Sequence, residues 1–232
     1  MPYYGFYFDP TYLLVLIGVV LCMIASARVK TTYKKYEKVG SRSGYTADQV
    51  AYMILRNAGI TDVSIHHISG DLTDNYNPKE HTLNLSDSVY GSRSIAAIGV
   101  AAHECGHAIQ HANAYAPLTI RSAIIPAANI GSAISWPLIL IGLLIPRVDY
   151  LITLGIILFS LVVALQFVTL PVEFNASRRA MAILEGSGYL YPDELKGARS
   201  VLTAAAMTYV AAMVSASLQL LRLVLLFGNR RR

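Results

Sequence analysis

Three histidines stand at four-residue intervals in one short stretch of the chain, AAHECGHAIQHAN at residues 101–113. His103 and His107 flank Glu104 in the pattern His-Glu-x-x-His. On a helix, residues four apart lie on the same face, one turn from each other. The two imidazoles can therefore reach a single Zn²⁺ at about 2.0–2.1 Å. Glu104 is offset by one residue and can act as general base on a metal-bound water, so the pattern predicts a hydrolytic zinc site.

His111 continues the spacing, but an unbroken helix opposes its use as a third ligand. A rise of 1.5 Å per residue separates His103 and His111 by about 12 Å along the helix axis. Zinc proteases with a third histidine have a glycine and a turn after the second one, whereas Ala108-Ile109-Gln110 contains no such breaker. We expect His111 to cap the helix, to line the cleft near the substrate, or to bind nothing.

A catalytic zinc needs three protein ligands and an open position, and two histidines with one glutamate form an established set. The glutamates available outside the motif are Glu80, Glu173, Glu185 and Glu194. Glu173 stands out because it follows an apolar stretch, and Pro171 would suit the start of a new helix with Glu173 in its first turn. Glu185 and Glu194 lie near Gly and Pro residues, and we interpret them as ordinary surface charges.

The composition indicates a membrane protein. Apolar residues make up 54% of the 232 residues and charged residues only 14%, against roughly 25% charged in ordinary globular domains. Uncharged blocks at 11–27, 123–145 and 151–170 approach or reach the roughly 20 residues of a membrane span. A fourth block, 201–227, is interrupted by Gln219 and Arg222. An arginine in lipid is costly, so Arg222 should face a partner, a water-filled cleft or the interface.

The basic residues predict the orientation of these spans. Five Lys or Arg residues follow the first block within residues 28–38 and none precedes it, and cytoplasmic flanks carry such an excess. Residues 28–122 and 171–200 are therefore predicted to be cytoplasmic, although the terminal Asn-Arg-Arg-Arg then lies outside, against the rule. The net charge of +5 is explained by contact with anionic lipid headgroups, and no nucleic-acid partner is expected.

The segment between the first two spans has the pattern of a small α+β domain. Residues 46–59 have the cap signals of a helix, residues 62–69 and 81–86 alternate like strands, and residues 70–80 have a loop composition. The strand at 81–86 is a candidate for pairing with an extended peptide. The predicted organisation is an N-terminal transmembrane anchor (1–27), a soluble segment with the His-Glu-x-x-His helix (28–122), a transmembrane hairpin (123–170), a helix and loop with the third ligand (171–200) and a C-terminal transmembrane or interfacial helix (201–232).

Several of these stretches resemble a known family, the bacterial membrane zinc metallopeptidases of the YugP-like type, which are related in catalytic pattern to the gluzincins. The matching motifs are AAHECGHAIQHA with YAPLTIRS, LPVEFNASRRA, LTDNYNP before LNLS, and AAAMTYVAA. The resemblance covers nearly the whole chain. It implies that His103, His107 and Glu173 bind Zn²⁺ and that Glu104 is catalytic.

The predicted protein is thus a mainly α integral membrane protein with three or four transmembrane helices and a small α+β, zincin-like cytoplasmic insert. We expect a zinc metalloendopeptidase of the bacterial cell membrane that acts on a peptide or protein substrate and contacts the lipid bilayer. The alternative is a non-enzymatic, zinc-binding membrane scaffold or assembly factor. Tyr209 and Arg178 are possible contacts to the substrate or transition state, although packing explains Tyr209 and a basic membrane flank explains Arg178.

Overall fold

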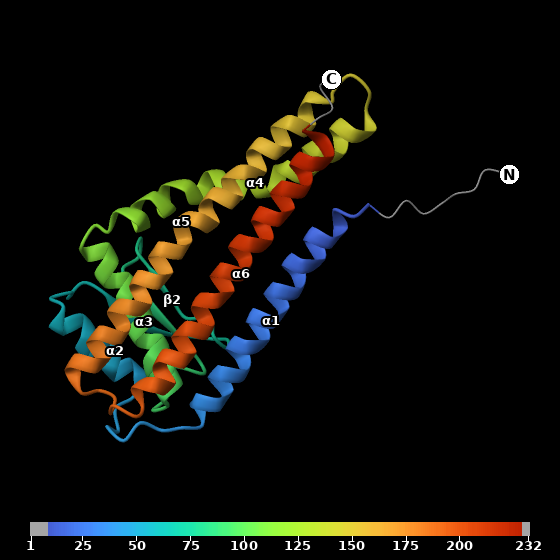
Figure 1. Cartoon of the computed structure of the whole chain (residues 1–232). Coiled ribbons are helices and arrows are strands. Elements are labelled where there is room, and N and C mark those ends of the chain that lie inside the picture. The colour runs from blue at the N-terminus through green and yellow to red at the C-terminus, as the bar shows by residue number, and fades with distance from the viewer. Residues whose placement is uncertain (1–8, 229–232) are drawn as a thin grey trace. The chain divides into compact units, whose positions relative to one another are not determined.

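The computed structural model describes residues 9–228, and it is mainly helical with one small sheet (Figure 1). The elements of this part of the chain are α1 (Tyr12–Glu37), α2 (Ala47–Asn57), β1 (Ser64–Ile68), β2 (Asn75–Asn77), β3 (Thr82–Ser86), α3 (Ile95–Ala112), α4 (Ala116–Leu144), α5 (Tyr150–Ser187) and α6 (Leu195–Phe227). The predicted helices and the two predicted strands of the soluble segment are confirmed. The predicted loop at 70–80 also contains the short strand β2.

Among the described residues, four helices, α1, α4, α5 and α6, are long and apolar enough to cross a membrane. The prediction of a mainly α membrane protein is confirmed, and the last apolar block lies in one continuous helix of 33 residues. Many apolar side chains on these helices are exposed, and Leu16, Leu140 and Leu225 are each more than half exposed. Soluble monomers rarely leave such large apolar surfaces in water, so these faces suit lipid.

The prediction that Pro171 starts a new helix is wrong. Helix α5 runs without a break from Tyr150 to Ser187 and contains Pro171. A proline inside a helix loses one hydrogen bond and costs about 3 kcal/mol. The close packing of the following turn, around Ala176, against Gly106 of α3 outweighs this cost, so the ligand candidate Glu173 lies on the same helix as the apolar stretch before it.

Contacts divide the described residues into two compact units. Unit 1 comprises residues 9–24, 124–166 and 211–228, and unit 2 comprises residues 25–123 and 167–210. Each of the four long helices contributes one end to each unit. All the predicted site residues belong to unit 2.

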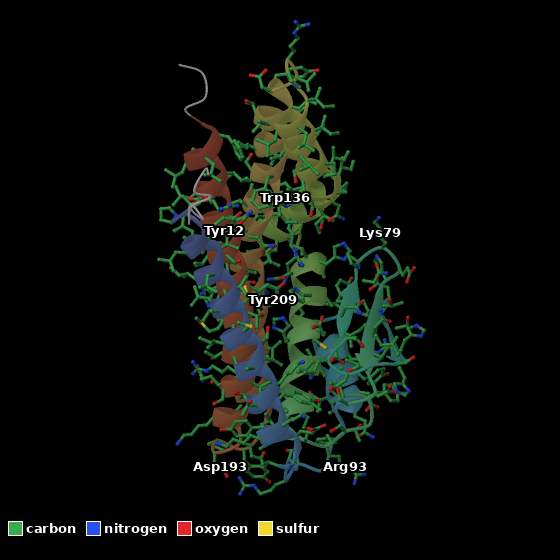
Figure 2. All side chains as sticks on the ribbon, turned by 90° about the vertical axis from the view of Figure 1, so that its right-hand side faces the viewer. Tyr12, Lys79, Arg93, Trp136, Asp193 and Tyr209 are labelled. Carbon is green, nitrogen blue, oxygen red and sulfur yellow. The ribbon has the colours of Figure 1, made fainter. Side chains whose placement is uncertain are left out.

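Unit 1 contains a close helix contact and an ion pair at the ends of α1 and α6. A Cβ atom at Gly18 would lie 2.7 Å from the Ser215 Oγ atom, so the two helices approach closely there. The Arg222 guanidinium lies 4.2 Å from the centroid of the ring of Tyr12, which is labelled in Figure 2. The Nη2 atom of Arg222 lies 3.8 Å from Asp9 Oδ2. Of the three surroundings expected for Arg222, a partner, a water-filled cleft or the interface, the structure shows a partner.

The sheet of unit 2 has the strand order β1-β3-β2. Strand β3 runs parallel to β1, with Ser64 opposite Thr82, and antiparallel to β2, with Asn75 opposite Asn84. The expectation that the strand at 81–86 pairs with an extended peptide is wrong, because β1 and β2 already occupy both of its edges. A peptide can join this sheet only at the outer edges of β1 or β2.

One apolar core joins the sheet of unit 2 to its helices. Helix α2 starts after Thr46, whose amide donates a hydrogen bond to Gln49 Oε1 over 3.0 Å, as its cap signals predicted. The core combines side chains from α2, β3, α3 and α5, among them Val50, Ile54, Leu83, Leu85, Ile98 and Leu184. It gives the helix with the His-Glu-x-x-His motif a rigid support.

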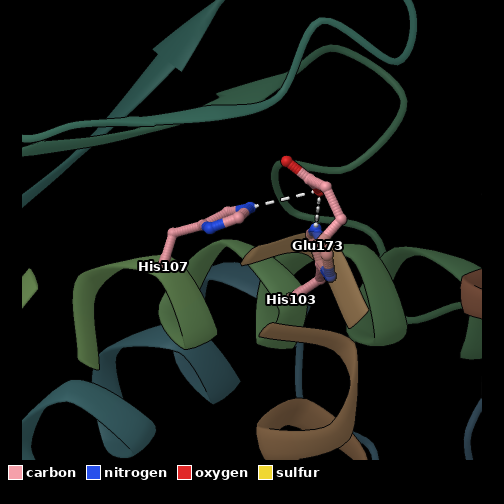
Figure 3. Close-up of side chains that lie close together, drawn as sticks. All are labelled: His103, His107 and Glu173. Atoms are coloured by element: carbon pink, nitrogen blue, oxygen red, sulfur yellow. Dashed lines mark hydrogen bonds and ion pairs between the residues drawn. The ribbon is translucent and has the colours of Figure 1, made fainter. Parts of the chain in front are cut away.

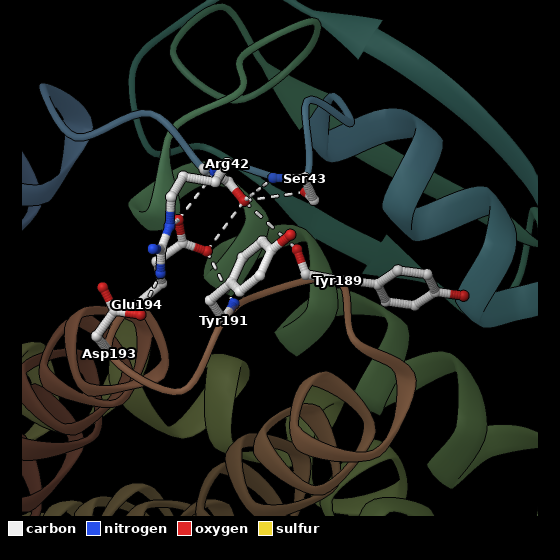
Figure 4. Close-up of polar contacts among 7 residues, drawn as sticks. Arg42, Ser43, Tyr189, Tyr191, Asp193 and Glu194 are labelled. Carbon is white, nitrogen blue, oxygen red and sulfur yellow. Dashed lines mark hydrogen bonds and ion pairs between the residues drawn. The ribbon is translucent and has the colours of Figure 1, made fainter.

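Glu194 links the segment that follows α1 to the segment that precedes α6. The interpretation of Glu194 as an ordinary surface charge is wrong. Only 5% of this residue is exposed. Its carboxylate accepts hydrogen bonds from the amides of Arg42 and Tyr191, at 2.9 and 2.8 Å, and from the Ser41 hydroxyl at 3.2 Å (Figure 4). Burial alone would raise the pKa of Glu194, but these hydrogen bonds outweigh it and hold the pKa below its ordinary value.

Candidate metal centre

Helix α3 places both motif histidines on one face. Its N-cap is Ser94, whose hydroxyl accepts a hydrogen bond from the Ala97 amide over 3.1 Å. The helix continues without interruption to residue 112, so His103 and His107 are one turn apart. Their ring centroids are separated by 4.7 Å and the ring planes are nearly perpendicular.

Glu173 of α5 completes a group of three possible metal ligands (Figure 3). Its Oε2 atom lies 3.3 Å from His103 Nε2 and 3.5 Å from His107 Nε2. In a tetrahedral zinc site with donor atoms about 2.05 Å from the ion, neighbouring donor atoms are about 3.3 Å apart. The two distances from Glu173 match this spacing, and the three possible ligand atoms all lie within 4.8 Å of one another. Two imidazoles with one carboxylate are a donor set of catalytic zinc sites.

Gly106, inside the His-Glu-x-x-His motif, allows α5 to approach α3. A Cβ atom at this position would lie 2.6 Å from the carbonyl oxygen of Ala176, a distance that real Cβ atoms do not tolerate. Ala176 lies three residues after Glu173 on the same helix. The glycine therefore determines how closely the Glu173 carboxylate can approach the two histidines.

Gln110 fixes the tautomer of His107. Its side-chain nitrogen faces two acceptors, the Val172 carbonyl at 2.8 Å and Asn175 Oδ1 at 3.0 Å. Asn175 Oδ1 also accepts from Arg179 Nε at 2.8 Å. The Gln110 oxygen must then face His107 Nδ1, at 3.1 Å, and accept its proton. This leaves the lone pair on Nε2 directed toward Glu173, as metal binding requires.

His103 and Glu173 also have partners beyond the ligand group. The Ser177 hydroxyl lies 3.1 Å from His103 Nδ1. Arg121 Nη1 of α4 lies 3.5 Å from Oε1 of Glu173, the oxygen that does not face the histidines. Arg121 thus engages Oε1 and leaves Oε2 as the oxygen that faces the two histidines.

The Glu104 carboxyl group is nearly buried and makes no side-chain hydrogen bond to the described residues. Only 8% of the residue is exposed. Burial raises the pKa of Glu104 above its ordinary value, partly offset by the two neighbouring histidines. Burial alone would lower the pKa of His107, but the carboxylates of Glu173 and Glu104 outweigh it and raise the pKa.

The three secondary candidates have different surroundings. Tyr209 of α6, which is labelled in Figure 2, lines a cavity together with His103, Glu104 and Glu173. His111 is outside the ligand group, and its Nδ1 atom lies 2.9 Å from the Tyr76 hydroxyl. The exposed side chain of Arg178 does not line this cavity.

The other glutamates do not reach the ligand group. Glu80 is exposed, Glu185 pairs with Arg199, and Glu194 is used in the contacts described above. The sequence reasoning missed the contributions of Gln110, Ser177 and Arg121. Gln110 had a recognisable signal, because it lies three residues after His107 and so near the same helix face.

The chain is similar to known proteins over most of its length. Residues 11–228 match the family described as "Putative neutral zinc metallopeptidase". The chain is also 45% identical over 207 residues to the "Putative membrane protease YugP" of Bacillus subtilis (strain 168), covering 89% of this chain and 92% of that protein. No solved structure matches the chain.

Proposed function

The chain belongs to the neutral zinc metallopeptidase family, and from this premise we propose that it is a membrane-embedded, zinc-dependent endopeptidase. The observation that carries the proposal is the position of Glu173, whose Oε2 atom lies within 3.5 Å of the Nε2 atoms of both motif histidines. Such a group beside a nearly buried glutamate fits the ligands and the general base of a peptidase.

In the proposed reaction, His103, His107 and Glu173 hold Zn²⁺. When bound, this ion polarises the scissile carbonyl and lowers the pKa of its water. Glu104 takes a proton from the attacking water and passes it to the leaving amine. Its buried carboxylate is a stronger base than an exposed one, because burial disfavours the charged form.

Three further groups have proposed roles in the same reaction. Tyr209 lines the cavity beside Glu104 and can donate a hydrogen bond to the oxygen that becomes negative in the transition state. Gln110 keeps the Nε2 lone pair of His107 available, and Arg121 orients Glu173.

We place the active site on the cytoplasmic side of a bacterial cell membrane. The support is the basic cluster at 28–38, which follows the first apolar block, and the basic residues within 171–200. Lys79 lies in an exposed turn of unit 2 (Figure 2). A cysteine at this position should react with a membrane-impermeant maleimide only after cells are opened, and labelling of intact cells would reverse the proposed orientation.

The experiment that tests the enzymatic proposal compares the purified full chain with its Glu104→Gln variant. Both should contain equal zinc, and loss of the general base should reduce cleavage of casein or peptides by about 10²–10⁴-fold. Glu185→Gln, a change of the same chemistry at an exposed position, is the matched control and should cleave normally. Equal zinc with no cleavage by any of the three proteins would instead favour a zinc-binding scaffold.

A further inference from the structure

A cavity of about 180 Å³ adjoins the metal centre within unit 2 and is bounded on one side by His103, Glu104 and Glu173. Most of its other walls are apolar side chains from α1, the loop before β2, α3 and α6, namely Val29, Leu72, Val100, Val201, Leu202, Ala205 and Ala206. An apolar cavity of about 150 Å³ is known to hold a benzene molecule. The cavity therefore has room for a phenyl or leucyl side chain beside the reacting groups.

Two of the three carboxylates at this cavity are already engaged, and the third, Glu104, is the proposed general base. Both oxygens of Asp74 accept hydrogen bonds from Ser86, from its amide at 2.7 Å and its hydroxyl at 2.9 Å. Glu173 faces the two histidines and Arg121. An acidic substrate side chain would lose its hydration here and face these carboxylates, which is costly. A basic side chain could pair only with Glu104, which the proposed reaction needs for the attacking water.

Leu72 contributes its side chain to this wall at a conformational cost. Its backbone has φ of +55°, a conformation that costs a residue with a Cβ atom about 1–2 kcal/mol. A leucine side chain has no polar atom that could compensate through a local hydrogen bond. Strain of this kind concentrates at ligand-binding and active sites, and here it holds an apolar side chain in the wall of the cavity.

Resting on the proposed function, we propose that this cavity is a subsite for a bulky apolar side chain next to the scissile bond. The substrates are then peptide segments that carry a residue such as Phe or Leu at that position. Small side chains leave the apolar walls without contacts, and charged ones are rejected.

Binding to the Glu104→Gln variant tests the subsite without peptide turnover. The probes are fluorescent peptides of otherwise identical glycine-rich sequence with one Phe, Leu, Ala, Asp or Lys, added to the zinc-loaded full chain in detergent. The Phe and Leu peptides should bind at least about tenfold more tightly than the Ala peptide, the usual discrimination by an apolar pocket. The Asp and Lys peptides should bind no better than the Ala peptide.

A filled cavity should abolish the preference. Ala205→Leu, added to the Glu104→Gln variant, places an apolar side chain in the cavity and should reduce binding of the Phe peptide to that of the Ala peptide. Thr203→Leu adds the same side chain at an exposed position of α6 outside the cavity lining and should leave the preference intact. As a second variant, Leu72→Gly removes part of the wall while relieving the strained backbone, and it should also weaken the preference.

Equal dissociation constants for the Phe and Ala peptides would overturn the subsite, as would equal effects of Ala205→Leu and Thr203→Leu. Cleavage of the same peptides by the wild-type chain separates this inference from the proposed function. Apolar preference in binding without cleavage refutes the peptidase and retains the subsite. Cleavage with no preference in binding refutes the subsite and retains the peptidase.

Discussion

Gln110 offers a sharp prediction about how the protein controls its metal ligands. The residue is fully buried, and its oxygen accepts the Nδ1 proton of His107 while its nitrogen donates to Val172 and Asn175. Replacing Gln110 with leucine keeps a similar volume but removes the acceptor. His107 can then place its proton on Nε2, which blocks the metal-binding lone pair.

The size of the effect follows from this geometry. Loss of such a partner of a ligating histidine typically weakens metal affinity 10–100-fold, which corresponds to about 1.4–2.8 kcal/mol. The two acceptors that lose the Gln110 donor keep other hydrogen bonds. Asn175 Oδ1 still accepts from Arg179 Nε, and the Val172 carbonyl remains in the backbone hydrogen-bond ladder of α5. The free energy of unfolding of the metal-free protein should therefore fall by only about 1 kcal/mol.

Gln110→Glu should give the opposite pattern. It keeps an oxygen for His107 Nδ1, so the zinc affinity should remain close to that of the wild type. Its second oxygen replaces the donor that faced Val172 and Asn175, so the free energy of unfolding should fall by about 1–3 kcal/mol.

The assay combines zinc competition against a chromophoric chelator with denaturant unfolding of the metal-free chain. The absorption spectrum of the cobalt-substituted protein reports the ligand geometry separately. Zinc affinity that is unchanged in Gln110→Leu, or that falls in both variants in proportion to their stability, would refute the tautomer argument.

Two further predictions concern the contacts that hold unit 2 together. Gly106→Ala places a Cβ atom against the Ala176 carbonyl and should cost about 1–3 kcal/mol of stability and weaken zinc binding. Gly186→Ala, a helical position with no atom within 4 Å of the added Cβ, is the control, and equal losses in unfolding and zinc titrations would contradict the argument. Glu194→Gln should lower the free energy of unfolding at pH 7 by about 1–3 kcal/mol. Because the folded pKa of Glu194 is lowered from 4.5, its contribution is present above that value and disappears as the pH falls through the folded pKa. The difference from wild type should therefore shrink in acid, and a difference independent of pH would refute this explanation.

Local patterns predicted much of the fold because they depend on neighbouring residues. The apolar blocks predicted the long helices, and the four-residue spacing predicted the face of α3 on which His103 and His107 lie. The path of α5 through Pro171 could not be predicted in this way, because tertiary packing near Gly106 outweighs the local preference of proline. Glu194 was misjudged for the same reason, since its partners at residues 41 and 42 are distant in sequence.

The candidate site was predictable only in part. The motif predicted two candidate ligands and a candidate general base, and Glu173 was favoured among the remaining glutamates by its position after an apolar stretch. The role of Arg121 depends on α4 reaching the outer oxygen of Glu173, which no spacing along the chain reveals. The central position of β3 likewise depends on β2, a strand of only three residues inside a stretch with loop composition.

The zinc content of the Glu173→Ala variant tests the central claim most directly. The full chain and the Glu185→Ala control should each retain one zinc ion per chain after equal dialysis against a weak chelator, as measured by mass spectrometry. Glu173→Ala should lose its zinc under the same conditions while retaining its helical circular dichroism spectrum. Full zinc retention by this folded variant would show that Glu173 does not complete the metal site.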